Sequence, residues 1–281
     1  MTALASSDFK RRLLAESTRR TRQARLRLWL LRVLLVVVVL AGWELASGRL
    51  IDVFWLSKPS LITSALLKQI RSGDLLFHVS FTLQEMALGL LFGGSAGALA
   101  GILLGRQRFL AELLTPVIIA IYSLPKVALA PLFILWFGID LTSKVVLVSV
   151  IVFFLVFFNT FSGVREVKAE LINVLKLAGA NDREVFWHVI LPSANIWVIA
   201  GLRLAVPYSL IGAVVAELMA ASRGVGYQLQ VAAQMFDTSG LFASLFVLMA
   251  IALVLNMVLT RVERRLLHWK SVGDRLDVMP T

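Results

Sequence analysis

The stretch GVREVKAELINVLKLAGANDREVFWHVILP, residues 163–192, is a long polar insert between two strongly apolar runs. Its first half carries apolar residues three and four positions apart, the period of a helix that buries one stripe; they are Val167, Leu171, Val174, Leu175 and Ala178. Gly179 then ends the helix, because a glycine there can adopt the left-handed conformation. Asn181 and Glu184 have the spacing of a capping box that opens a second helix. We predict a helix, a tight turn and a second short helix at the membrane surface, offering a firm contact to another protein. An interfacial amphipathic segment without a partner is the alternative.

The composition of the chain places it in the membrane. Its 281 residues are 59% hydrophobic, with a mean hydropathy of +0.85, which is too apolar for a water-soluble domain of this size. It has no cysteine, so disulfides and thiolate metal sites are excluded. Its histidines, His78, His188 and His268, have no ligand-like spacing. We therefore expect no metal site.

Six apolar runs are long enough to cross a bilayer. They cover residues of about 28–47, 82–104, 113–137, 144–161, 192–218 and 241–260. The sequence thus predicts an all-α, polytopic membrane protein. We expect a basic segment over 1–27, a transmembrane domain over 28–262 that includes the hairpin 163–192, and a basic tail over 263–281. The apolar residues 33–43 could also be the core of a signal peptide, but the basic segment before them is longer than is typical, which favours a retained span.

Glycines recur every fourth residue in the second span. This register gives one helix face a smooth ridge on which another backbone can pack closely; the ridge consists of Gly89, Gly93, Gly97, Gly101 and Gly105. Packing explains the pattern, and sliding of the helix during transport is an alternative.

Prolines and charges mark candidate positions inside the membrane. Pro116, Pro125 and Pro131 fall in the third span, so it should be kinked or broken near its middle, beside Lys126. A charge inside a span usually faces protein or water. Lys126 could line a path for an anion, or pair with Glu217 or with carbonyls freed by the prolines. Arg203 is expected to form a structural or gating ion pair. The full set of candidate path or gate residues is Pro125, Lys126, Asn159, Arg203, Ser209 and Glu217.

The distribution of Lys and Arg predicts the orientation. Nineteen of the 28 fall in the segments 1–27, 105–112, 162–191 and 261–281, against five in the alternate segments. The positive-inside rule then puts both termini and the hairpin in the cytoplasm. We interpret the formal charge of +11 as favouring contact with anionic lipid and not with nucleic acid.

Several short motifs resemble the permease subunits of type I ABC importers, over nearly the whole chain after residue 28. The loop carries Leu-Ala-Gly-Ala at 177–180, Phe186, Ile-Leu-Pro at 190–192 and Gly-Leu-Arg at 201–203. The stretch SLPKVALAPLFILWFG at 123–138, Ser-Lys at 143–144, Ala-Glu at 216–217 and Arg-Gly-Val-Gly-Tyr at 223–227 are most similar to the subgroup importing nitrate, bicarbonate, taurine, other sulfonates and related small solutes.

This resemblance implies the MetI-like transmembrane fold and a set of partners. The partners would be two ATP-binding subunits, a second copy of this permease, an extracytoplasmic solute-binding protein and membrane lipid, in a bacterial inner membrane. The loop would be the coupling helix that docks on the ATPase, through Asn173, Leu177, Ala178, Gly179, Ala180, Asp182 and Phe186. Where many permeases have Glu-Ala-Ala before the loop glycine, this chain has Asn173, Val174 and Leu175, which removes one ionic contact from that docking.

The chain is expected to transport and not to catalyse. It contains no Gly-x-x-x-x-Gly-Lys-Ser/Thr phosphate loop, so ATP and magnesium would be bound by the separate ATPase and no cofactor by this chain. We expect a small, anionic solute. The rival hypothesis is a secondary transporter driven by an ion gradient, which needs a carboxylate inside the membrane. Glu217 is the sole candidate carboxylate on the four inner spans in this reading.

Overall fold

A computed structural model describes residues 26–167 and 169–266, and nearly all of their regular structure is helical. Two compact units, residues 1–64 and 65–281, are treated separately below. The basic segments predicted over 1–27 and 263–281 lie mostly outside the described residues.

The first unit contains a helix over Leu26–Ala46, which is 21 residues long and apolar enough to cross a bilayer. This confirms the first predicted span. The chain then turns at Gly48, and the Glu44 carboxylate accepts hydrogen bonds from Ser60 N–H at 3.0 Å and Ser60 Oγ at 2.7 Å. Helix α2 (Pro59–Ser72) begins here, with proline in its first turn where no hydrogen-bond donor is missed, and continues into the second unit.

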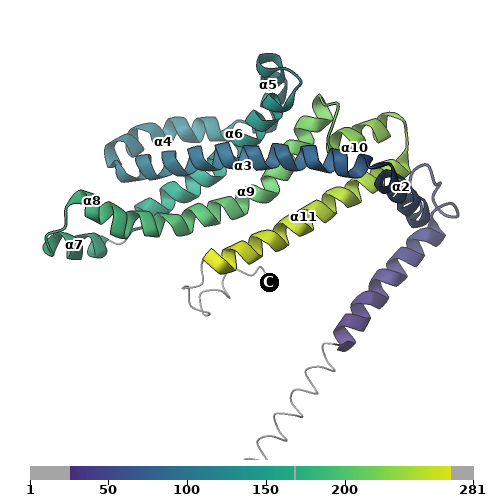
Figure 1. Ribbon diagram of the computed structural model, residues 1–281, viewed down its shortest axis with the longest axis horizontal. Coiled ribbons are helices and arrows are strands. Elements are labelled where there is room, and N and C mark those ends of the chain that lie inside the picture. The colour runs from purple at the N-terminus through teal and green to yellow at the C-terminus, as the bar shows by residue number, and fades with distance from the viewer. Residues whose placement is uncertain (1–25, 168, 267–281) are drawn as a thin grey trace, which may run out of the picture. The chain divides into compact units, whose positions relative to one another are not determined.

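The second unit contains the remaining membrane-length helices (Figure 1). These are α3 (Asp74–Arg106), α6 (Leu141–Arg165), the continuous helix α8–η2–α9 (Asp182–Met219) and α11 (Thr238–Leu266). With the first helix they make five candidate spans, and a bent helix pair raises the number to six. The prediction of an all-α protein with about six spans is confirmed.

The third predicted span is broken in the structure. Helix α4 (Arg108–Ser123) is followed by a 3₁₀ turn, η1 (Lys126–Leu129), and by α5 (Ala130–Phe137). The two halves are bent by 77°. Because Pro125 and Pro131 cannot donate backbone hydrogen bonds, the helix cannot continue through this segment. The predicted break beside Lys126 is therefore confirmed.

Helices α3 and α6 pack on each other along the glycine ridge, and α9 packs mainly on α6 and also on α3. A Cβ built on Gly93 or Gly97 would come within 3.0 Å of backbone atoms of α6. The contacts pair Gly89 with Val148 and Gly105 with Val164, so the two helices run parallel and end at the same face. Close backbone packing, the first of the two explanations, accounts for these glycines.

One predicted boundary was wrong. Pro192 was expected to begin the fifth span after a separate short helix, but α8 (Asp182–Val185) runs through the π-helical turn η2 (Phe186–Ile190) into α9 (Leu191–Met219). In η2 the N–H of Leu191 donates to Phe186 O, five residues back, and this wider turn accommodates the ring of Pro192. Between the fifth and sixth predicted spans the structure contains a further short helix, α10 (Val225–Gln234).

Candidate functional site

The hairpin turn is built as its sequence predicts. Helix α7 (Ala169–Leu177) ends at Gly179, whose φ is +88°. Gly179 N–H donates to Lys176 O and Ala180 N–H donates to Leu175 O, both at 3.0 Å, which is the Schellman pattern. Two carbonyls that the helix end would leave unpaired are thereby satisfied.

The helix after the turn opens with a complete capping box. The Asn181 side chain accepts from Glu184 N–H at 2.9 Å, and the Glu184 carboxylate accepts from Asn181 N–H at 2.8 Å. Lys176 and Asp182 form an exposed ion pair across the turn at 3.2 Å. These local bonds fix the angle between α7 and α8, so the hairpin has a defined shape.

An apolar stripe on α7 is left uncovered. Leu171, Val174 and Leu177 are 51%, 64% and 88% exposed, and α7 buries none of its residues. The other predicted contact residues of the hairpin, Asn173, Ala178, Gly179 and Asp182, are also exposed, with Ala180 and Phe186 half-buried. A large apolar stripe that none of the described residues covers indicates a partner surface.

The second half of the hairpin contacts the helix bundle next to the end of α3. The Arg106 guanidinium at the end of α3 lies over the Phe186 ring, 4.3 Å from its centroid. Val185 is 3% exposed. The second half of the hairpin is thus in contact with the end of α3.

Lys126 lies at the break in the third span, as the sequence predicts. Its ammonium donates to the backbone carbonyl of Tyr122 and lies 3.6 Å from the centroid of the Tyr122 ring and 5.4 Å from that of Phe154. The carbonyl of Tyr122 lies in the last turn of α4. Because the helix ends there, it supplies no further backbone N–H group to pair with this carbonyl. Lys126 thus caps the broken helix and holds a half-buried positive charge there.

Glu217 is fully buried near the end of α9 and binds the junction where a loop opens into α10. Its carboxylate accepts from Gly226 N–H at 2.6 Å and from Thr82 Oγ1 at 2.7 Å. Thr82 Oγ1 in turn accepts from Val225 N–H at 2.9 Å, and His78 Nδ1 accepts from Gly224 N–H at 3.0 Å. Three consecutive backbone N–H groups of the Arg-Gly-Val-Gly-Tyr motif are therefore held by α3 and α9.

Glycine is required where this loop meets Glu217. A Cβ on Gly224 or on Gly226 would come within 3.0 Å of the carboxylate, and Gly224 has a φ of +106°. The exposed Arg223 beside them lies over the ring of Phe81 at 4.9 Å. The Ala-Glu motif at 216–217 and the Arg-Gly-Val-Gly-Tyr motif at 223–227 are separate in the sequence but contact each other through Glu217.

The prediction that Glu217 is the sole candidate carboxylate of the inner spans was wrong. Glu85 of α3 is 1% exposed, and its carboxylate lies 3.4 Å from the ammonium of Lys144 on α6. The register of the two helices accounts for this pair, because the spacing between Gly89 and Val148, and between Gly101 and Thr160, also separates Glu85 from Lys144. Parallel helices in that register bring the two charges together.

The remaining predicted path or gate residues lie apart from this cluster. Arg203 forms an ion pair with Glu263 of α11 at 2.9 Å, which links two membrane helices. Asn159 donates to Leu155 O at 2.8 Å and the buried Ser209 donates to Val206 O at 2.6 Å, both within their own helices. These contacts show an ion pair at Arg203 and local hydrogen bonds at the other two.

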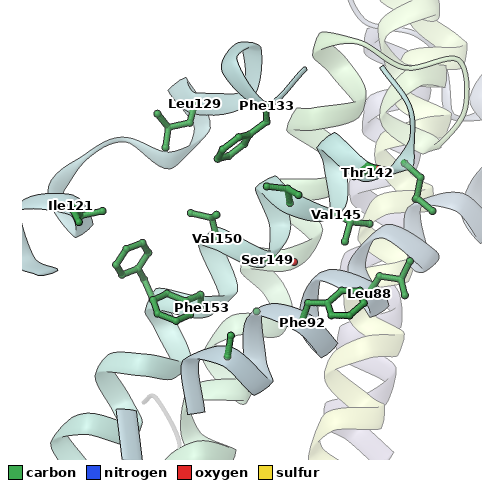
Figure 2. A pocket seen from close by; sticks show the side chains of 15 residues that line it. Leu88, Phe92, Ile121, Leu129, Phe133, Thr142, Val145, Ser149, Val150 and Phe153 are labelled. Atoms are coloured by element: carbon green, nitrogen blue, oxygen red, sulfur yellow. The ribbon is translucent and has the colours of Figure 1, made fainter. Parts of the chain in front are cut away.

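The broken span covers an apolar pocket of about 820 Å³. Figure 2 shows Leu129 and Phe133, from the segment after the break, facing Val150 and Phe153 of α6. The lining also includes Phe92 of α3 and carries polar side chains only at Thr142 and Ser149. An anion would find no cation here, so this pocket does not resemble an anion site.

Comparison with known proteins identifies the family. The model of the family described as "Binding-protein-dependent transport system inner membrane component" matches residues 89–268, more than half of the chain. The chain belongs to this family of ABC importer permeases. The permease is 34% identical over 244 residues to the putative aliphatic sulfonates transport permease protein SsuC of Bacillus subtilis (strain 168), covering 86% of this chain and 88% of that one.

A second relative and a solved structure agree. The taurine transport system permease protein TauC of Escherichia coli (strain K12) is 32% identical to the permease over 254 residues, covering 89% and 91% of the two chains. A structure of the MetNI methionine ABC transporter in an inward-facing conformation aligns with a TM-score of 0.55 at 17% identity, covering 71% of the permease and 95% of that chain. The predicted MetI-like fold and the resemblance to the sulfonate and taurine subgroup are confirmed, as is a multi-pass permease of the inner membrane.

Proposed function

We propose that this permease forms, with a second copy of itself, the translocation path for a small anionic solute, and that a separate ATPase drives it through the hairpin 163–192. A solute-binding protein would deliver the solute from outside, and both termini would lie in the cytoplasm. ATP and magnesium would be bound by the two ATPase chains and not by the permease.

The observation that carries this proposal is the exposed apolar stripe of α7 on a rigid turn. Burial of Leu171, Val174 and Leu177 in a groove would remove apolar surface from water. The Schellman turn and the capping box supply a fixed shape for docking. Asn173, where relatives of the superfamily carry glutamate, leaves the contact to depend on shape and apolar burial.

The excess of Lys and Arg on the hairpin side of the membrane supports its cytoplasmic placement. The parallel helices α3 and α6 both end there, in Arg106 and Arg165. An ATPase in the cytoplasm could then reach α7.

Two considerations support an anionic solute. The relatives named above are described as permeases for aliphatic sulfonates and for taurine, and both solute classes carry a sulfonate group. Lys126 offers a half-buried ammonium at the break in the third span. We propose that Lys126 contacts the anion. In a taurine uptake assay, Lys126→Arg should retain uptake and Lys126→Met should lose it.

Docking of the ATPase is tested by co-purification from the native host under mild solubilisation. The expected partner contains a phosphate loop and hydrolyses ATP. Val174→Asp combined with Leu177→Asp should abolish its recovery, because two charges would enter the apolar contact. Leu50→Asp, at a leucine that is 85% exposed in the connection after the first helix, is the matched control and should leave recovery unchanged.

Failure to recover any ATPase with the native chain would overturn the importer proposal. The alternative is then an ion-gradient-driven carrier that uses Glu217. Against it, Glu217 is already occupied by hydrogen bonds to Thr82 and Gly226. Uptake that persists without ATP and collapses with the proton gradient would favour the carrier.

A further inference from the structure

A second pocket, of about 540 Å³, lies behind the hairpin, where α3 and α6 end. Its lining combines the charged residues Arg106, Arg165, Lys176 and Asp182 with the apolar residues Val164, Ile172 and Val185. The pocket is separate from the apolar stripe of α7 because Leu171, Val174 and Leu177 do not line it.

Two of its cations lack an acidic partner. Lys176 is already paired with Asp182 at 3.2 Å. Over the residues that the structure describes, no carboxylate lies within ion-pair distance of the guanidinium of Arg106 or Arg165. The pocket therefore carries an uncompensated positive charge.

Both guanidinium groups lie over aromatic rings. Arg106 lies over Phe186 at 4.3 Å and Arg165 over Phe161 at 5.5 Å. A contact with a ring face leaves guanidinium N–H groups available, and their planar fork matches the oxygens of a phosphate. Because both arginines line one pocket, an anion bound there could accept from both.

The depth of the pocket selects the kind of anion. Because Arg106 and Arg165 end two helices long enough to cross a bilayer, lipid headgroups would be within reach of both guanidinium groups. Val164, Ile172 and Val185 offer apolar surface next to the charges, which suits a molecule with a charged head and an apolar body.

We propose that this pocket binds the phosphate group of an anionic phospholipid and that the bound lipid braces the hairpin against α3 and α6. The lipid would bridge Arg106 and Arg165 and fill the space behind α7. The site does not depend on the proposed ATPase, since it faces away from the apolar stripe. A free phosphate ion shares the same chemistry but would leave the apolar lining in contact with water.

The simplest competing explanation is that the two arginines only compensate the negative ends of the α3 and α6 dipoles. That role needs positive charge but no lipid. A direct measurement of bound lipid separates the two.

The test uses the full-length permease in nanodiscs of phosphatidylcholine with 20% phosphatidylglycerol, with retained lipid counted by native mass spectrometry. The wild type should retain phosphatidylglycerol selectively. Arg106→Gln and Arg165→Gln should each weaken that retention about fivefold, and the pair about 25-fold. Arg183→Gln combined with Arg261→Gln removes the same charge from exposed sites outside the pocket and should change nothing.

A double glutamine variant that keeps phosphatidylglycerol as tightly as the control would overturn the proposal. If that variant does not fold, Arg106→Lys with Arg165→Lys preserves the charge without the fork and should still lose about tenfold; unchanged retention there overturns the proposal equally. In phosphatidylcholine nanodiscs, inorganic phosphate at millimolar concentration should not stabilise the protein. If it does, and the double variant abolishes the effect, the site is one for a free anion and not for lipid.

Discussion

The Glu217 carboxylate accepts a hydrogen bond from the backbone N–H of Gly226 at 2.6 Å, inside a cluster that is closed to solvent. This single bond ties the end of α9 to the first turn of α10. Its second oxygen accepts from Thr82 of α3, so one side chain joins three parts of the bundle.

Glu217→Ala should strongly destabilise the permease. The change leaves Gly226 N–H and the Thr82 hydroxyl buried without their acceptor, at a cost of about 3 kcal/mol. Unfolding by SDS in mixed micelles measures the loss. Glu170→Ala, at an exposed glutamate of α7, is the control and should stay within about 0.5 kcal/mol of the wild type. Equal stability of the two variants would contradict the structure.

The Glu85–Lys144 pair predicts strong coupling in a double-mutant cycle. Lys144→Met leaves the Glu85 charge buried without its partner and should cost about 3–5 kcal/mol. Adding Glu85→Met should recover much of that loss, since the buried Glu85 charge is then removed as well. The same unfolding assay serves, and additive effects of the two substitutions would show that the residues do not interact.

Gly93→Ala should destabilise the contact between α3 and α6. The new methyl group would meet backbone atoms of Ser149, which cannot move away as a side chain could. A cost of about 1–3 kcal/mol is expected. Gly42→Ala is the matched control, because a Cβ there meets nothing within 4 Å and alanine favours a helix. That control should be neutral or stabilising by thermal unfolding.

The hairpin turn is tested locally by hydrogen exchange. Asn181→Ala removes one half of the capping box and should increase exchange at residues 182–185, corresponding to a loss of about 1 kcal/mol. Glu184→Gln can still accept from Asn181 N–H, and should leave protection nearly unchanged. Gly179→Ala should raise exchange as well, because φ of +88° is unfavourable for alanine.

Features set by neighbouring residues could be predicted from the sequence. The turn at Gly179 and the capping box at Asn181 depend on the chemistry of a few consecutive residues, and the break beside Lys126 depends on two prolines. The glycine ridge has a period that only a helix face explains. Each of these was placed at the correct residues.

Features that join distant segments could not be predicted in the same way. The pairing of Glu85 with Lys144 depends on which helices are neighbours, and a single sequence does not state that. The contact of Glu217 with Gly226 arises from a loop that folds back on its own helix. Pro192 indicated a helix start, but a single π turn allowed the helix to pass through it.

Because α8, η2 and α9 form one continuous helix, a displacement of the hairpin can be transmitted to the other end of that helix. A helix of 38 residues is about 57 Å long, and it has Asp182 at one end and Glu217 near the other. Pivoting about its midpoint by about 10° would displace each end by about 5 Å, in opposite directions. A push on the outside of α7 would therefore be expressed at the opposite membrane surface as a shift of the segment 224–226, reduced by any bending at the π turn 186–190 or at Pro207 inside α9.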